Sequence, residues 1–273
     1  MANLPLYLLT ALLYAALGIR FWQGDHAVSP GSVRAKILHL VVLIPLLAHA
    51  LLLYRTIETP TGFNLGFGET LSIIVWLTVF IYWLANFTHE LEGFQAIVFP
   101  VATICILVPL IWPSHHIIPH TGLLYLKLHL LIAFLAYSLF TIAAWHALII
   151  TIAERGLHGG RLPRVFSHLP PLLSMEKLLF RLITSGFALL TLAVLSGMLF
   201  SEELFGKPLE LNKNTVFASL SWFIFAILLT GRHFYGWRGR TATRFTLIGS
   251  FMLVLAYLGS RFVLDVLLHH VSS

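Results

Sequence analysis

Histidine is the residue type in this chain that is best suited to metal binding or acid–base chemistry. The chain holds 14 histidines against 11 acidic residues. An ionisable side chain is costly inside a bilayer, so a histidine within a long apolar run is a candidate for function. His49 and His129 lie within such runs, and the adjacent pair His269 and His270 follows the last run. These positions decide which chemistry the chain can support.

His129 opens the fifth apolar run, two residues after Lys127. The same helical face continues at spacings of three and four with Ala133, Ala136, Phe140, Ala143 and Ala147. Small residues on one face let a neighbouring helix backbone, or a flat porphyrin, come close. The spacing alone favours ordinary helix packing over a ligand. His146, further along the same run, is expected to anchor the helix at the opposite membrane interface.

His49 lies six residues before Arg55, which marks the end of the second apolar run. At 1.5 Å of rise per residue, it lies roughly 9 Å below the membrane interface. A histidine at this depth either binds a ligand or forms a hydrogen bond to a neighbouring helix. The sequence favours neither of these two explanations.

The end of the chain combines a cation with the histidine pair. Arg261 and Asp265 stand four residues apart and can pair on a helix. His269 and His270 follow about two turns later, where a chain end is often only solvated. However, an arginine beside a histidine also suits a haem, since guanidinium binds the propionate carboxylates in a bidentate manner.

Together these residues permit a haem site near one face of the membrane. Neutral imidazoles on facing helices are the usual axial ligands of haem iron, and helix bundles build such sites from inward-facing side chains. The site we expect is a non-covalent haem b with iron ligands His129 and His270, or His269 in place of His270. His49 and Arg261 complete the candidate cofactor-binding set.

Other chemistry finds little support. The single cysteine, Cys105, cannot form an intrachain disulfide or attach a c-type haem covalently. The chain contains no phosphate-binding loop, nucleophile elbow or H-E-x-x-H zinc motif. We therefore assign no catalytic residue and expect a carrier or chaperone rather than an enzyme. The net charge of +6 is spread over short links between apolar runs, so nucleic acid is not an expected partner.

The elements that must position these residues are transmembrane helices. Hydrophobic residues make up 58% of the chain and charged residues only 10%, far fewer charges than the roughly 25% of a soluble domain. The expected fold is an all-α polytopic bundle of about eight helices, forming a single membrane domain over residues 1–273. The predicted spans are Leu4–Trp22, Ile37–Tyr54, Gly68–Asn86, Phe94–Trp112, Leu124–Ile150, Leu179–Phe200, Val216–Gly231 and Phe245–Leu264.

The distribution of cations predicts the orientation. Twelve of the 17 basic residues fall in the links after odd-numbered spans and five on the opposite side. Cytoplasmic loops carry the excess of lysine and arginine, so both termini are expected outside, on the periplasmic face. No cation precedes the first apolar run, which predicts a mature helix rather than a signal peptide.

Four stretches of the chain resemble the cytochrome c assembly family of the CcsA, CcmC and HemX kind, and within it the YpjD-type inner-membrane proteins. A-H-A-L-L-L-Y-R carries His49, G-F-G-E-T-L-S carries Glu69, and L-K-L-H-L-L-I-A-F-L-A-Y-S carries His129. The C-terminal third holds N-K-N-T, S-W-F-I-F-A, G-W-R-G-R and Y-L-G-S-R-F-V-L-D in the family's order. The resemblance implies a multi-pass protein of the bacterial inner membrane that handles haem and works with other membrane proteins.

The sequence departs from the haem-handling members of that family in three places. Their Trp-rich external motif before the seventh span is missing, and only N-K-N-T stands where it would end. A second intramembrane histidine is replaced by Thr230, and the C-terminal histidines fall a residue or two late. These departures keep a second hypothesis open, a cofactor-free membrane scaffold that regulates another membrane protein.

Overall fold

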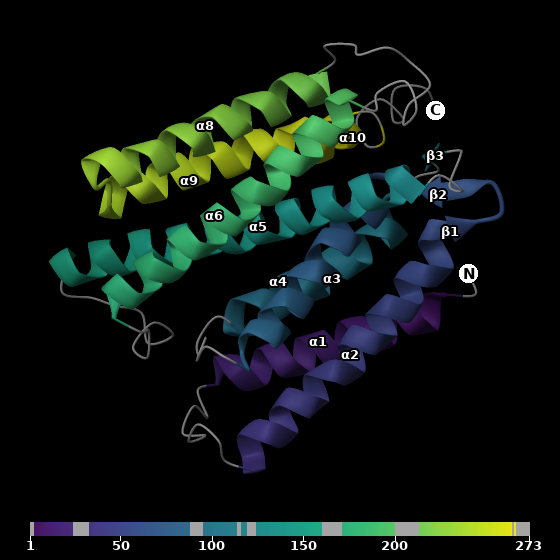
Figure 1. Cartoon of the computed structure of the whole chain (residues 1–273). Coiled ribbons are helices and arrows are strands. Elements are labelled where there is room, and N and C mark those ends of the chain that lie inside the picture. The colour runs from purple at the N-terminus through teal and green to yellow at the C-terminus, as the bar shows by residue number, and fades with distance from the viewer. Residues whose placement is uncertain are drawn as a thin grey trace. The chain divides into compact units, whose positions relative to one another are not determined.

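The computed structural model describes residues 3–23, 33–87, 95–113, 116–118, 124–159, 171–199, 213–263 and 265 (Figure 1). Most of these residues are helical. Seven helices of the described part are long and apolar enough to cross a membrane, with Gly239–Phe262 counted as one helix. The helices are α1 (Leu4–Trp22), α2 (Val33–Ile57), α3 (Phe67–Ala85), α4 (Gln95–Ile111), α5 (Leu124–Gly159), α6 (Leu172–Leu199), α8 (Lys213–Tyr235), α9 (Gly239–Val254), the π-helical η2 (Leu255–Gly259) and α10 (Ser260–Phe262). The predicted all-α, polytopic fold is confirmed.

Several helices extend beyond the predicted spans: α5 ends at Gly159 instead of Ile150, and α6 begins at Leu172 instead of Leu179. The seventh span, expected to be short, is the 23-residue helix α8. The eighth begins at Gly239 instead of Phe245 and runs through η2 into α10. Gly236 and Gly239 adopt positive φ angles of 65° and 53°, which let the chain reverse within three residues between α8 and α9. The basic G-W-R-G-R segment is therefore a tight turn with its last residues in α9.

The described chain folds as two compact units. Unit 1 contains α1 to α4 and the three short strands, whereas unit 2 contains α5 to α10. The expectation of one membrane domain over residues 1–273 stays a prediction.

Unit 1 is a ring of four helices in the order α1, α4, α3, α2. Its interior holds Tyr14 of α1 stacked on Phe99 of α4, with ring centroids 6.1 Å apart. Two glycines face prolines of α4: a Cβ at Gly18 would lie 3.0 Å from Pro100 Cδ, and one at Gly68 would lie 2.8 Å from Pro109 Cα. The glycines let α4 lie close to both neighbours, and this brings α1 and α3 near His49 of α2.

A small antiparallel sheet lies at one end of unit 1. It pairs β1 (Glu58–Thr59) with β2 (Gly62–Asn64), and β2 with β3 (Ile117–Ile118). Asn64 accepts a hydrogen bond at its side-chain oxygen from the backbone N–H of His116, 3.1 Å away. The sheet joins the α2–α3 link to the segment that follows α4, and it closes that end of the ring.

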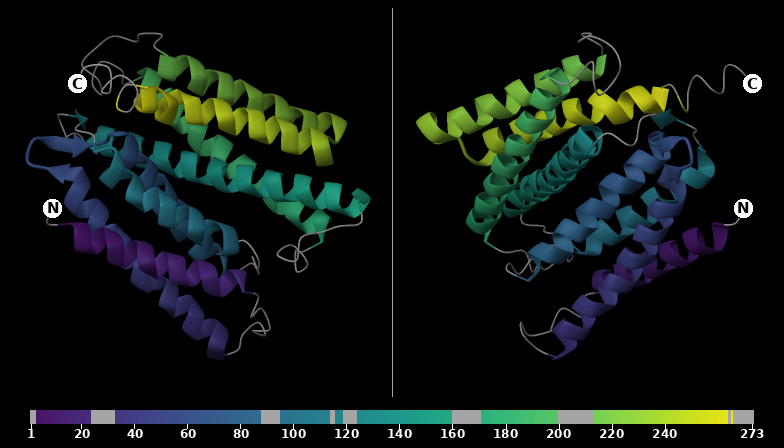
Figure 2. Two further views of the ribbon diagram at one scale, coloured as in Figure 1. Left: turned by 180° about the vertical axis from the view of Figure 1, so that it is seen from behind. Right: turned by 45° about the vertical axis from the view of Figure 1, so that its right-hand side comes forward.

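Unit 2 is also a ring of four helices, in the order α6, α5, α9, α8 (Figure 2). Phe140 of α5 and Phe225 of α8 stack at its centre with centroids 4.0 Å apart. Gly186 of α6 faces Phe140, and Gly249 of α9 faces Phe225. Because both glycines lack a side chain, the two rings fill the interior between all four helices.

Candidate functional site

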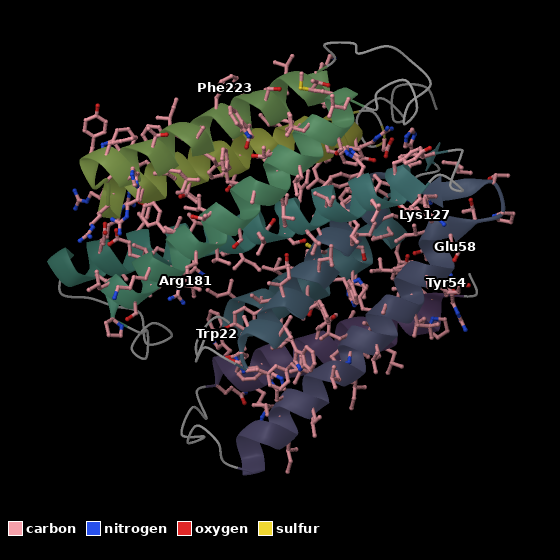
Figure 3. All side chains as sticks on the ribbon, in the orientation of Figure 1. Trp22, Tyr54, Glu58, Lys127, Arg181 and Phe223 are labelled. Carbon is pink, nitrogen blue, oxygen red and sulfur yellow. The ribbon has the colours of Figure 1, made fainter. Side chains whose placement is uncertain are left out.

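His129 lies in the first turns of α5, at one end of unit 2, and is half-buried. Its Nδ1 is 2.8 Å from the hydroxyl oxygen of Ser196 in α6. Lys127 marks the same end of α5, while Arg181 of α6 lies toward the other end of the unit (Figure 3). The face that follows His129 packs as the spacing predicted, since Ala136, Phe140, Ala143 and Ala147 are all at most 1% exposed.

The hydroxyl of Ser196 can bond both to the backbone of α6 and to His129. Ser196 donates its only hydroxyl proton to the carbonyl oxygen of Ala193, 3.1 Å away. If Ser196 keeps this bond, its oxygen accepts from His129 and the imidazole proton lies on Nδ1. In this tautomer of neutral histidine the lone pair is on Nε2, the form in which imidazole ligates a metal, with the N–H held by a second group.

Small and aromatic side chains surround this end of α6. A Cβ at Gly197 would lie 3.4 Å from His129 Cε1, so the imidazole edge lies against the α6 backbone. Farther along α6, Thr191 accepts a 2.8 Å hydrogen bond from the indole of Trp222 in α8. Trp222 also stacks on Phe187 at 5.4 Å. These contacts hold α6 to α8. His129 lies nearer the end of the bundle than Phe187 and Trp222.

Arg261 lies in α10, at the end of unit 2 where α5 begins and α6 ends (Figure 2). It is half-buried, and its guanidinium carbon lies 5.6 Å from the centroid of the Tyr257 ring, within the range of a cation–π contact. The π-helical η2 precedes it; such turns change the direction in which later side chains point and often occur at functional sites. His269 and His270 lie outside the described residues.

His49 has a different environment, in unit 1. It is fully buried, with its Nε2 2.8 Å from the Ser72 hydroxyl of α3 and its Nδ1 3.3 Å from the Tyr14 hydroxyl of α1. Tyr14 also contacts the imidazole edge-on, with centroids 5.8 Å apart. Both ring nitrogens thus link α2 to its neighbours, and binding a metal would require one of these hydrogen bonds to break.

One expectation about the histidines was wrong, and two of their hydrogen-bonding partners were not predicted. His146 was expected to be an interfacial anchor, but it is only 1% exposed, because α5 extends 13 residues beyond it. The two serines were missed, although Ser72 and Ser196 each lie within hydrogen-bonding distance of a candidate histidine. Serine is common in transmembrane helices, so no local pattern marks these two.

No group of three or more histidine, cysteine, aspartate or glutamate side chains is placed to hold a metal ion in the described part of the chain. A haem needs fewer protein ligands than a bare ion, because the porphyrin supplies four nitrogens. In the described residues, the nitrogen atoms that could ligate a haem iron therefore belong to single histidines.

Comparison with known proteins decides the family. A model described as "Cytochrome C assembly protein" matches residues 37–268, which is most of the chain. The chain belongs to this cytochrome c assembly family. The match includes His49 and His129 and ends one residue before His269.

Individual relatives agree with this family. The inner membrane protein YpjD of Escherichia coli is 27% identical over 81% of this chain and 84% of its own length. The cytochrome c biogenesis protein CcsA of Prochlorococcus marinus is 23% identical over 92% of this chain and 88% of its own. An uncharacterized 28.8 kDa protein of Azospirillum brasilense is 32% identical over 53% of the chain and 54% of its own. With seven helices able to cross a membrane, this family member is a multi-pass inner-membrane protein.

Proposed function

We propose that this member of the cytochrome c assembly family binds haem b non-covalently and handles it as a carrier or chaperone. The observation that carries the proposal is the 2.8 Å contact between His129 Nδ1 and the Ser196 hydroxyl, which can accept the Nδ1 proton. A metal-ligating histidine usually donates its second ring N–H to a neighbouring group, and Ser196 is such a group. The haem would be the cargo of the protein, not the site of a reaction.

In this proposal Nε2 of His129 would hold the haem iron together with His270 or His269, and Arg261 would hold a propionate. The start of α5 and α10 lie at the same end of unit 2, which supports the pairing of His129 with Arg261 (Figure 2). His49 is a weaker candidate, because its two ring nitrogens already have partners within unit 1.

The test is an absorption spectrum of the full chain purified in detergent, oxidised and reduced, with and without added haem. The wild-type protein should give a Soret band, and His129→Ala should lose it while keeping its thermal stability. His233→Ala is the matched control, because His233 is an exposed histidine of the same unit. It should leave the band unchanged.

Two results would contradict the haem proposal. One is a wild-type protein with no Soret band even after haem is added. The other is a folded His129→Ala variant that keeps the full band, which would place the haem elsewhere.

A cofactor-free scaffold is the second candidate function. Thr230, which replaces an intramembrane histidine of the haem-handling relatives, is exposed on α8. A ligand at this position would point away from the interior of unit 2. This favours a function that does not use a second haem site. If the scaffold proposal holds, haem-free protein should co-purify with a membrane partner in constant stoichiometry; haem-free protein that purifies alone would contradict it.

A further inference from the structure

The outer face of α9 carries two arginines directly before an apolar stripe. Helix α9 packs against α5 and α8, and in the view from behind it runs along the near side of unit 2 (Figure 2). Arg240 and Arg244 stand four residues apart on this helix, and both are exposed. Ile248 and Phe251 continue at spacings of four and three, with exposed fractions of 52% and 58%. Residues at these spacings share one helix face, and we call these four residues the α9 strip.

The α9 strip crosses the boundary between lipid headgroups and lipid tails. The segment Gly239–Phe262 is one of the seven apolar spans and has 24 residues. At 1.5 Å per residue it is about 36 Å long, whereas the hydrocarbon core of a bilayer is about 30 Å thick. Arginine side chains near the end of a span also extend toward the headgroups. Arg240 and Arg244 therefore reach the headgroup region, while Ile248 and Phe251 face the lipid tails.

The turn before α9 fixes the start of the strip. The backbone carbonyl of Trp237 accepts a 3.2 Å hydrogen bond from Arg232. The Trp237 ring also packs against Phe245, with centroids 5.1 Å apart. Phe234 and Tyr235, at the end of α8, are 73% and 78% exposed, and exposed aromatic residues are common at membrane interfaces. The aromatic residues of this turn thus indicate the same boundary as the two arginines.

The positive charge of the strip is only partly balanced by acidic side chains. Residues 231–245 contain four arginines and no acidic residue. Arg240 lies 3.8 Å from Glu154 of α5, with its own side chain 64% exposed. No acidic side chain of the described residues forms an ion pair with Arg244. Like charges four residues apart on a helix repel each other, so an anion bound between Arg240 and Arg244 would stabilise the first turns of α9.

We propose that the α9 strip binds an anionic phospholipid, with its phosphate on Arg240 and Arg244 and an acyl chain along Ile248 and Phe251. Guanidinium groups bind phosphate oxygens through paired N–H donors. A soluble anion would contact the arginines but not the apolar half of the strip. A choline lipid carries a cation that the arginines repel. The membrane around the protein supplies the lipid, and this proposal does not depend on haem binding.

The test is native mass spectrometry of the full chain purified in detergent, with two lipids that share the same acyl chains. Dioleoyl phosphatidylglycerol should bind about tenfold more tightly than dioleoyl phosphatidylcholine, because only the former has a net negative charge for the arginines. Arg244→Gln should remove this preference. Phe251→Ala should weaken the binding of both lipids to a similar extent, because both place an acyl chain on the strip.

Lys177→Gln is the matched control, because Lys177 is an exposed cation of α6 in the same unit. The residues that follow it on its face are Arg181, Thr184 and Ser185, which are all polar and exposed. No exposed apolar side chain therefore follows Lys177 for two turns, and an acyl chain has no stripe to lie on. The control variant should keep the full preference for phosphatidylglycerol.

Four results would overturn the proposal. One is equal binding of the two lipids to the wild-type protein, and another is a preference for phosphatidylglycerol that survives in Arg244→Gln. A preference that Lys177→Gln and Arg244→Gln reduce equally would show a general basic surface instead. Displacement of phosphatidylglycerol by an equal concentration of inorganic phosphate would show a site for soluble anions.

Discussion

Units 1 and 2 are both rings of four helices, yet their candidate histidines differ in burial and in hydrogen bonding. In unit 1, His49 is fully buried and hydrogen-bonded at both ring nitrogens, to Tyr14 and Ser72. In unit 2, His129 lies at the end of the ring, and its Nδ1 bonds to Ser196. A histidine that joins three helices stabilises their packing, whereas His129 lies near the start of its helix and is only half-buried.

The comparison shows why depth in an apolar run is a poor guide to ligation. His49 is the deeper residue in sequence terms, but depth brings it within reach of hydroxyl groups on two other helices. A polar group in a membrane interior must find such partners, because no water is available to replace them. Shallow residues are under less constraint, and a ligand can use them.

The largest effect on stability should come from His49→Ala. The variant loses two hydrogen bonds of about 0.6 kcal/mol each, as is typical within membranes, and leaves a cavity in the interior of unit 1. We expect a loss of about 3 kcal/mol in the free energy of unfolding, with no change in any haem spectrum. Denaturant titration in detergent, followed by circular dichroism, measures the first quantity. A variant as stable as the wild type would remove the distinction between the two units.

Gly249→Ala should destabilise unit 2 by about 2 kcal/mol, in the range for overpacked interiors. The new Cβ would lie 2.8 Å from Phe225 Cζ, and Phe225 is fully buried against Phe140. Gly186→Ala, where the nearest atom is Phe140 Cζ at 3.1 Å, should cost less. Thermal melts of the two variants check this order. The reverse order would mean that α6, not α9, packs more tightly in this unit.

Ser196→Ala should separate positioning from ligation. It removes the acceptor for His129 Nδ1–H, so haem affinity should fall about tenfold, in the range for groups that orient metal ligands. Ser72→Ala removes the matching hydroxyl beside His49 and should leave haem affinity unchanged. Haem titrations followed by absorbance test both variants. Equal effects of the two serines on affinity would contradict the assignment of different roles to their histidines.

The smallest effect should come from Trp83→Phe in unit 1. The Trp83 indole N–H donates a 3.0 Å hydrogen bond to the backbone carbonyl of His39. The His39 imidazole also stacks on the Trp83 ring with centroids 5.0 Å apart. Phenylalanine keeps the stack but loses the hydrogen bond, so the free energy of unfolding should fall by about 0.6 kcal/mol. A loss above about 2 kcal/mol would mean that the indole also holds α2 and α3 in place by packing.

The lengths of the apolar runs predicted which segments form helices. They did not predict which side chains form hydrogen bonds between helices. The first helix, Leu4–Trp22, has the predicted bounds; Pro5 lies in its first turn, and Gly24 and Asp25 follow its end in the sequence. The start of α9 was predicted six residues late, because Arg238, Arg240 and Arg244 made the segment look like a loop. Cations at a membrane surface are compatible with a helix, and the positive φ of Gly239 sets the actual beginning.

The candidate site was predictable only in part. His129 and the small residues after it follow from spacing along one helix. Ser196 is 67 residues away in sequence, and its contact depends on how α5 and α6 cross. The burial of His146 likewise depends on the length of α5 beyond it, which the polar residues near its end concealed. Pairings between helices are set by packing, and a single sequence does not display them.

The central claim is that His129 ligates haem through Nε2, and chemical rescue tests it most directly. His129→Gly should lack the Soret band of the wild-type protein when supplied with haem. Adding imidazole, which can enter the space left by the side chain, should restore a six-coordinate haem spectrum, and it should do so at a lower concentration than for free haem in the same detergent. A His129→Gly variant that binds haem normally without imidazole would contradict the claim, as would a folded variant that imidazole fails to rescue.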